Sequence, residues 1–493
     1  MQTNHTLKLL TAKTSYKLLT CAALVPIADF LLYGKPAGWT LGLFGVSLLL
    51  AVLGCNQTVA HSRVVDIASY ATLGLTFALM EAPSALAWCM FCFSIVALTL
   101  APKLARVEDA RAVVKSVLRY ALTAWWRLYR DNLIISHIKK RRQKLHGNKR
   151  AFVRHWLLPI GLSAVFIMLF ASANPIITGW LDKINWRVIA EYISVPRMLF
   201  WLMTASGCWA LIRPKLKQRK AGKKYDYIPK YDFSLTALLF NERSILTSLV
   251  LFNGLFFIQN MLDVAFLWSG AALPNGMTHA QYAHQGAYPL IVTALLAAIF
   301  VLIALKPNSA TERMPAIRGL VYAWVGQNIF LVMSSITRLM GYIEEYSLTY
   351  LRVVALIWMA LVAMGLILII TRIHLQKSNG WLININSASL YATLYLCCFV
   401  NFGGIIADYN IKHSREVTGS GANLDTYYLQ TEIGAQAIPA LLWFEQHHPD
   451  NARVQDVRTL RQSLEAQVSN SMQDWRQWTF RDFRLSHSLQ SAN

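Results

Sequence analysis

Amide and ionisable side chains occur at helical spacing inside two otherwise apolar stretches of the sequence. In the stretch 244–269, the residues that share one helical face at spacings of seven and three are Asn253, Asn260 and Asp263. In the stretch 317–338, the corresponding residues are Gln327, Ser334 and Arg338, bordered by Asn328 and Ser335. Charged side chains are costly inside a bilayer and mark functional sites there by default. We predict that Asp263 and Arg338 form a buried charge pair or bind an ion or anion.

The connections that follow these stretches add further polar groups. A hairpin is predicted at 339–348, and the charged residues in it and just after it are Glu344, Glu345 and Arg352. The loop predicted at 270–288 supplies Tyr282, His284 and Tyr288. The imidazole of His284 could donate or accept a proton. These groups are expected near the outer ends of the two stretches.

A third apolar stretch, 385–407, contains Asn401 seven residues before Asp408, so a continuous helix would point both side chains the same way. Together these groups predict a polar cavity that opens outward, formed by Asp263, Asn260, Tyr282, His284, Tyr288, Gln327, Arg338, Glu345, Arg352, Asn401 and Asp408. The alternative is that they only join helices, because amides between membrane helices stabilise them by about 0.6 kcal/mol each. In that case Arg338 and Glu345 would simply pair at the interface.

The composition indicates which elements must position these residues. Of 493 residues, 55% are hydrophobic and only 15% are charged, against about 25% charged in soluble proteins. This argues against a soluble multi-domain enzyme and against a disordered chain. A membrane-crossing helix needs about 20 apolar residues, and eleven stretches qualify: 17–33, 39–57, 64–80, 84–101, 155–173, 195–212, 244–269, 287–305, 317–338, 349–371 and 385–407. We therefore predict an all-α, polytopic transmembrane helix bundle of about eleven spans.

The basic residues predict the orientation of the bundle. With the N-terminus inside, the cytoplasmic segments contain 33 of the 47 Lys and Arg residues, as the positive-inside rule requires. An odd number of spans then puts a helical C-terminal tail on the outer side of the cytoplasmic membrane. The predicted regions are a four-span region 1–101, a basic segment 102–154, a two-span region 155–212, a basic loop 213–243, a five-span domain 244–407 and an exported tail 408–493.

The basic segment 102–154 has the pattern of an amphipathic helix. Its apolar residues at helical spacing are Val107, Val114, Leu118, Ala121, Trp125 and Tyr129, and basic residues occupy much of the rest. Such a helix lies in the headgroup plane, and each basic residue gains about 1 kcal/mol from anionic lipid. The bilayer and its anionic headgroups are therefore the expected partners. Nucleic acid is the disfavoured alternative, because two membrane spans flank the segment. The tail closes on Trp475, Trp478, Phe480 and Phe483 interleaved with arginines, which suits a cap lying on the outer surface.

Residue patterns for cofactor or metal binding are missing from the sequence. No histidine lies near the middle of a predicted span, so paired axial haem ligands are not expected. Cys89 and Cys92 have redox spacing, but they lie in an apolar stretch and are expected to be packing residues. We expect neither a cofactor nor a metal.

Several short motifs resemble those of a bacterial multi-pass membrane family recorded only as a domain of unknown function. The motifs are Tyr282-Ala-His-Gln-Gly-Ala-Tyr-Pro-Leu290, Leu267-Trp268-Ser-Gly270 with Leu273-Pro274, Gln327-Asn328, Arg338 with Tyr342, Leu348-Thr349-x-x-Arg352 and Ala407-Asp408-Tyr409-Asn410. The resemblance covers roughly 230–440 and leaves the N-terminal 230 residues outside. It implies a membrane protein and no assigned activity. One departure is Gln285, where the family pattern implies a basic residue.

Three functions fit these patterns. A transport-like protein, slightly favoured, would move a small solute or lipid through the polar stripe. An envelope enzyme acting on a lipid-linked or periplasmic substrate would use Asp263, His284 and Asp408 as acid–base groups. A non-catalytic sensor or assembly partner would have fully paired stripes and no cavity. The patterns leave the substrate, the coupling ion, the protein partners and the oligomeric state open.

Overall fold

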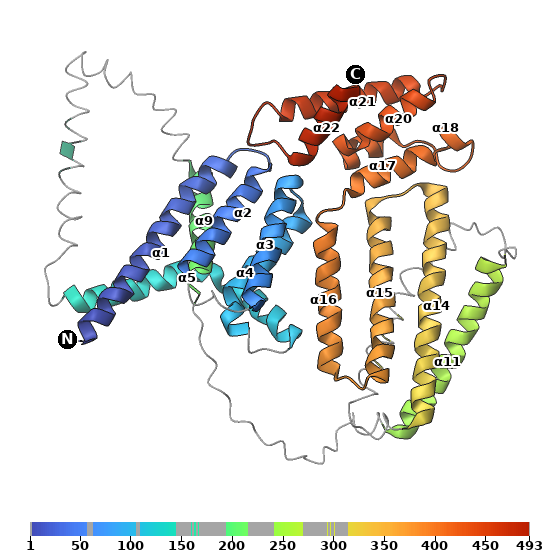
Figure 1. Cartoon of the computed structure of the whole chain (residues 1–493), viewed down its shortest axis with the longest axis horizontal. Coiled ribbons are helices and arrows are strands. Elements are labelled where there is room, and N and C mark those ends of the chain that lie inside the picture. Colours follow the sequence, from blue (N-terminus) through green and yellow to red (C-terminus); the bar gives the residue numbers. More distant parts are fainter. Residues whose placement is uncertain are drawn as a thin grey trace. The chain divides into compact units, whose positions relative to one another are not determined.

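The computed structural model describes residues 2–56, 63–104, 109–143, 194–214, 241–269 and 314–492, with a few isolated positions between them. Regular structure in these ranges is helical throughout, with no strand (Figure 1). The all-helical fold expected from the sequence is therefore confirmed for this part of the chain. Contacts divide it into one unit of Met1–Arg106 with Val114–Lys217 and a second of Val107–Val113 with Gln218–Asn493.

Six of the described helices are long and apolar enough to cross a membrane, and a seventh counts if one bent helix pair is a single span. The six are Ser15–Leu32, Arg63–Glu81, Val195–Ile212, Glu242–Trp268, Pro315–Tyr346 and Tyr350–His374. Two shorter apolar helices, Thr40–Cys55 and Ala85–Ala101, coincide with predicted spans. The predicted spans 155–173 and 287–305 fall outside the described residues except at isolated positions. These helices agree with a membrane protein.

The first unit contains α1 (Gln2–Leu32), α2 (Thr40–Cys55), α3 (Arg63–Glu81), α4 (Ala85–Leu104), most of α5 (Ala110–Gln143) and α9 (Val195–Ile212). A polar cluster joins α1 to α9: Asp29 forms an ion pair with Arg197, whose Nε lies 2.8 Å from Oδ1, and accepts a hydrogen bond from Trp201. Helix α5 attaches to the C-terminal end of α9, where Tyr120 donates to the carbonyl of Ala210 at 2.5 Å.

The second unit contains a row of apolar helices. Helix α11 (Glu242–Asp263), continued by a π-helix, η2 (Val264–Trp268), packs on α14 (Pro315–Tyr346). Helix α14 also packs on α15 (Tyr350–His374), which packs on α16 (Asn379–Cys397) (Figure 1). The apolar core between these helices is centred on Trp324, which contacts Phe252 and Phe300.

The rest of the second unit is a cap of short helices lying across one end of the row (Figure 1). Its helices are α17 (Phe402–Lys412), α18 (Arg415–Thr418), α19 (Thr426–Tyr428), η4 (Leu429–Ile433), η5 (Gly434–Ala437), α20 (Ile438–His447), α21 (Val454–Ser471) and α22 (Phe480–Ala492). Fully buried Leu441, Phe444 and Leu464 belong to its core. The tail expected to be helical is therefore a folded cap with its own core.

Two predicted boundaries are wrong. Helix α14 does not end in a hairpin at 339–348: it stays helical to Tyr346, and only Ser347–Thr349 form the turn. The predicted span 385–407 is not one helix, because α16 ends at Cys397 and the helix that follows is bent away by 70°. Asn401 is the N-cap of α17, and its side chain accepts a hydrogen bond from the Gly404 amide. Capping groups of this kind begin a new helix.

Candidate functional site

Helices α11 and α14 are joined by a seam of polar side chains. Asn253 donates to the carbonyl of Leu320 at 3.0 Å, and Asn260 donates to the carbonyl of Gln327 at 3.2 Å. In both pairs the partner is 67 positions later in the sequence, so residue numbers rise together and the two helices are parallel. The side chain of Gln327 bonds back to Asn253 at 3.1 Å. Two of the three predicted polar stripes therefore face each other.

The seam ends in an ion pair between Asp263 and Arg338. The two side chains are 0% and 4% exposed, respectively. Gln259, one turn before Asp263, donates to the same carboxylate at 3.0 Å. The charge pair expected from the spacing is present, whereas its role as a functional site stays a prediction. A buried ion pair between two helices stabilises their contact only while both charges are present, because either charge alone would be buried without compensation.

The π-helix η2 begins immediately after Asp263. In a π-helix each turn contains one extra residue, and single π-turns inside α-helices are frequent at functional sites. The turn leads to Trp268, whose indole nitrogen lies 3.5 Å from the Ser334 hydroxyl. The buried pair is thus flanked by a local change of helix type, which the sequence pattern does not predict.

Several amide oxygens in the seam have no hydrogen-bond partner within the described part of the chain. They are the side-chain oxygens of Asn260, Gln327 and Asn328. Asn260 and Asn328 are buried. A buried acceptor without a partner costs about 1–3 kcal/mol. The seam therefore has unused capacity to accept hydrogen bonds or to contact a cation, which a purely structural seam would lack.

The third predicted stripe does not join the seam. Helix α16 packs on α15, so α15 separates it from α14 in the row. Asn401 and Asp408 belong to the cap: Asn401 lies 3.4 Å from Arg481, and Asp408 is exposed and paired with Lys412 at 2.7 Å. The continuous helix that would bring both residues beside Asp263 is absent from the described part of the chain, because α16 ends at Cys397, before Asn401.

A second polar site lies where the turn between α14 and α15 meets the cap. The side chain of Asn410 bonds to both main-chain groups of Leu348. Tyr428 accepts a hydrogen bond from the amide of Tyr350 at 3.0 Å. Arg352 donates to the carbonyls of Tyr346 and Ser347. Three separate side chains therefore hold one short turn.

Ser347 has a main-chain conformation that glycine normally adopts. Its φ is +69° with ψ of 169°. Non-glycine residues in this region cost about 1–3 kcal/mol and cluster at ligand clamps and active sites. The bonds from Arg352 and Asn410 on either side of Ser347 offset this strain. Such a turn is typical of a backbone held ready for a ligand.

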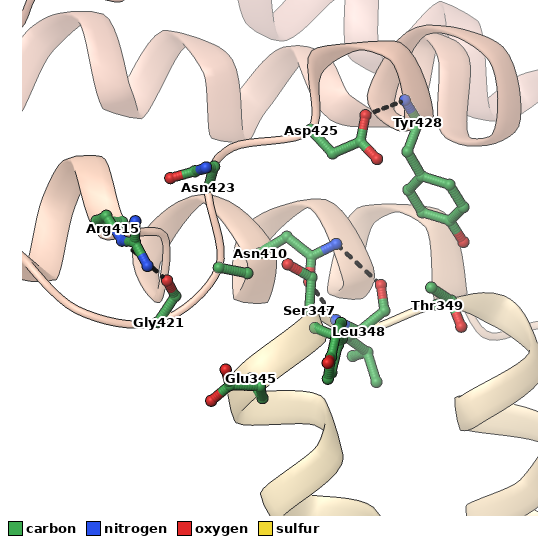
Figure 2. A pocket seen from close by; sticks show the side chains of 12 residues that line it. Glu345, Ser347, Leu348, Thr349, Asn410, Arg415, Gly421, Asn423, Asp425 and Tyr428 are labelled. Carbon is green, nitrogen blue, oxygen red and sulfur yellow. Dashed lines mark hydrogen bonds between the residues drawn. The ribbon is translucent and has the colours of Figure 1, made fainter. Parts of the chain in front are cut away.

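A cavity of about 350 Å³ opens beside this turn (Figure 2). Its lining is the C-terminal end of α14, the turn, Asn410 of α17 and the loop between α18 and α19. The ionisable residues that line it are Glu345, Arg415, Asp425 and Tyr428. Burial raises the pKa of the Tyr428 hydroxyl above its usual value. The cavity has a size suited to a small molecule.

The residues expected to form one outward site thus fall into separate groups. Asp263, Asn260, Gln327 and Arg338 lie in the seam, while Glu345 and Arg352 belong to the cavity and its turn. Tyr282, His284 and Tyr288 lie outside the described residues. Sequence reasoning missed Arg415, Asp425 and Tyr428 as site residues. Asn410 belongs to the motif Ala407-Asp408-Tyr409-Asn410, but nothing in the local spacing indicates its distant main-chain partner.

A family model described as a domain of unknown function, DUF4153, matches residues 67–442. The match therefore begins in the first unit, so the expectation that the N-terminal 230 residues lie outside the family is wrong for residues 67–230 and holds only for residues 1–66. It includes the seam, the turn and the cavity, and it ends before α21. No curated protein and no solved structure matches the chain.

Proposed function

Because the chain belongs to the DUF4153 family, whose function is unassigned, we propose a function from its geometry: a transport-like membrane protein. In this proposal the seam between α11 and α14 is the element that opens. The Asp263–Arg338 pair would be broken and remade as an ion or small polar solute passes. The observation that carries the proposal is this buried ion pair between two apolar helices. Ionisable groups in such positions commonly belong to substrate or ion pathways.

The proposal includes eleven spans in a bacterial cytoplasmic membrane, with the N-terminus inside and the C-terminal cap outside. The parallel direction of α11 and α14 supports an odd number of spans between them, which the single predicted span 287–305 provides. The turn Ser347–Thr349 and the short connection from α15 to α16 support alternating directions for α14, α15 and α16. The excess of basic residues before α11 supports a cytoplasmic start for this helix.

The seam favours transport over the two other hypotheses. Its unpartnered amide oxygens disagree with the fully paired stripes expected of an inert sensor or assembly partner. The enzyme hypothesis needs acid–base groups in one place, yet Asp408 is exposed and paired with Lys412 while Asp263 is buried with Arg338. His284, the third acid–base candidate, lies outside the described residues.

Cysteine accessibility tests this proposal without knowledge of the substrate. In a variant freed of its seven cysteines, Ser334→Cys would place a thiol in the seam with little change of volume. We expect a membrane-impermeant thiol reagent to label it in both right-side-out and inside-out vesicles. Labelling from the outer side alone would instead support a receptor or enzyme, and protection from both sides would reduce the seam to structural packing.

Three control variants calibrate the labelling. Asn423→Cys, exposed in the cap, should react only in right-side-out vesicles. Lys377→Cys, exposed in the turn before α16, should react only in inside-out vesicles. Ile369→Cys, buried in the apolar core between the helices, should react in neither. Reaction of the first two from the opposite sides would contradict the proposed orientation.

The proposed partners are the bilayer and its anionic headgroups, bound through α5. The helix exposes a stripe of large apolar side chains, which are Val114, Leu118, Leu122, Trp126 and Tyr129. Arg119 and Arg130 lie beside this stripe. An exposed apolar stripe flanked by basic residues is typical of helices that lie in the headgroup region. Attachment of α5 to the end of α9 supports a position at the membrane surface.

A further inference from the structure

The cavity beside the turn combines charges of both signs that have no ion-pair partners. Within the part of the chain that the structure describes, Glu345, Asp425 and Arg415 form no salt bridge, although all three line the same cavity. Neighbouring charges of the cap behave differently: Asp408 pairs with Lys412, and Glu445 pairs with Arg461 at 2.7 Å. Glu432 and Asp450 of the cap also form no salt bridge within the described residues, so what distinguishes Glu345, Asp425 and Arg415 is that they line one cavity.

Two of the three charged groups on the cavity wall are held in place by hydrogen bonds that leave their charges available. Asp425 uses one carboxylate oxygen to cap α19 through the amide of Tyr428, at 2.9 Å. Arg415 donates through Nε to the carbonyl of Gly421 at 3.2 Å, which fixes the side chain against the loop (Figure 2). Glu345 lies on the last turn of α14, on the other side of this loop (Figure 2). The wall is therefore built before any ligand binds.

We propose that this cavity binds a small zwitterion. Its ammonium group would lie at the carboxylates of Glu345 and Asp425, and its anionic group at the guanidinium of Arg415. Charge-assisted hydrogen bonds of this kind are stronger than neutral ones. The Asn410 amide and the main chain of the strained turn would supply neutral contacts. The inference goes beyond the transport proposal and does not depend on it, because the seam contributes no residue to this cavity.

Two natural sources have this chemistry: a free solute, such as an amino acid, and the headgroup of an ethanolamine phospholipid. Both carry an ammonium group and an anionic group a few bonds apart. The cap lies at the end of the apolar helices, so either source fits the position of the cavity (Figure 1). The shared chemistry defines the site, and the source is a matter for the experiment.

Calorimetric titration of the purified full chain in detergent tests the proposal with four probes. Phosphoethanolamine and glycine are zwitterions, whereas ethanolamine and inorganic phosphate each offer one half of the charge pattern. We expect at least one zwitterion to bind about tenfold or more tightly than either half, as loss of a charged hydrogen-bond partner implies. Equal binding of ethanolamine or of phosphate would overturn the proposal, and so would binding of no probe.

Single substitutions then assign the contacts. Glu345→Gln, Asp425→Asn and Arg415→Gln each remove one charge, and the asparagine side chain introduced by the second of these would retain the capping oxygen. We expect each to weaken zwitterion binding about tenfold or more. Glu344→Gln makes the same change one residue away, outside the lining, and should leave the affinity within about twofold. Equal losses of affinity in Glu344→Gln and Glu345→Gln would overturn the assignment, since they would show only the effect of net charge near the cavity.

Nanodiscs distinguish the two sources. If the ligand is a lipid headgroup, adding phosphatidylethanolamine to phosphatidylglycerol nanodiscs should stabilise the native chain and leave Glu345→Gln unchanged. If the ligand is a free solute, the lipid should have no such effect while the soluble zwitterion still binds. Both results support a zwitterion site. Equal stabilisation of the native chain and Glu345→Gln would contradict the lipid assignment. The readouts are separate from cysteine labelling of the seam, so either proposal can fail alone.

Discussion

The side-chain amide of Asn410 is hydrogen-bonded to both main-chain groups of Leu348, 62 residues earlier in the chain. The Leu348 amide donates to Oδ1 at 2.6 Å, and Nδ2 donates to the Leu348 carbonyl at 2.9 Å. All the groups involved are buried. The Asn410 side chain thus supplies hydrogen-bond partners for the buried main-chain amide and carbonyl of a tight turn, which have no helix partners. Through this contact, the cap fixes the connection between α14 and α15.

Replacing Asn410 by alanine should destabilise the second unit. The substitution leaves a buried amide and a buried carbonyl without partners, at about 1–3 kcal/mol each. We expect a lower melting temperature in detergent, followed by intrinsic fluorescence, and weaker zwitterion binding in the cavity. Asn423→Ala removes an exposed side chain of the same type and should leave the melting temperature nearly unchanged. Equal melting temperatures for the two variants would show that the turn is held by other contacts.

The Asp263–Arg338 pair predicts strongly non-additive substitutions. Asp263→Asn or Arg338→Gln leaves one buried charge uncompensated, which typically costs about 3–5 kcal/mol. The double variant removes both charges and should recover most of the lost stability. Thermal unfolding of the four proteins gives this cycle directly. Additive losses in the double variant would mean that the two side chains act independently of each other.

The pair could be predicted from the sequence because the relevant rules are local and strong. Asp263 and Arg338 interrupt apolar helices, and the seven-residue spacing of the other polar groups identifies the face on which each lies. A buried charge needs a partner, and the two stretches offer few alternatives. The same reasoning predicted the apolar helices, since hydrophobic length alone decides whether a segment can span a membrane.

The cap and its cavity could not be predicted in this way. The hydrogen bonds between Asn410 and Leu348 depend on how α17 packs against the turn between α14 and α15. The spacing of residues in the sequence does not indicate this packing. The break before α17 has a local signal, because Asn401 precedes Gly403 and Gly404 and asparagine is a favoured N-cap. The seven-residue spacing from Asn401 to Asp408 instead favours a continuous helix. A Cβ atom at Gly403 would lie 2.8 Å from the hydroxyl of Tyr350, so a larger residue there would displace that side chain.

Reporter fusions should test the orientation of the bundle. With the C-terminus outside, alkaline phosphatase fused after residue 493 should be active, and green fluorescent protein fused there should not fluoresce. Fusions after residue 220, within the basic loop 213–243, should show the opposite pattern, because basic loops stay in the cytoplasm. Truncation at 220 keeps each reporter next to the loop under test. Fluorescence of both fusions would place residues 220 and 493 in the cytoplasm. With the N-terminus inside, an even number of spans would then precede each position.

The raised pKa of Tyr428 predicts a loss of stability in alkali. Burial raises the pKa of this hydroxyl above its usual value near 10, and the hydrogen bond that it accepts from the Tyr350 amide opposes this rise in part. The folded pKa exceeds the unfolded pKa, so the contribution is complete below about pH 10 and is lost as pH rises through the folded pKa. Tyr428→Phe should melt at a lower temperature at neutral pH, yet the difference from the native chain should shrink in alkali. A difference in melting temperature that stays constant as the pH rises would contradict the raised pKa of Tyr428.

The exposed stripe on α5 predicts stabilisation by anionic lipid. Leu122 and Trp126 are exposed on this stripe, whereas the opposite side of the helix contains buried Val117 and Tyr120. Insertion of Leu122 among headgroups would be prevented by Leu122→Glu, which adds a negative charge and removes apolar area. We expect phosphatidylglycerol nanodiscs to raise the melting temperature of the native chain above its value in phosphatidylcholine, and to raise that of Leu122→Glu much less.

Thr123→Glu is the matched control for this substitution. It introduces the same charge one residue away, off the apolar stripe, and should retain most of the stabilisation by phosphatidylglycerol. The gain should also decrease with added salt, since attraction between surface charges is screened over about 10 Å at 0.1 M. If Leu122→Glu and Thr123→Glu respond equally to anionic lipid, the effect comes from net charge alone and α5 does not lie on the membrane through its apolar stripe.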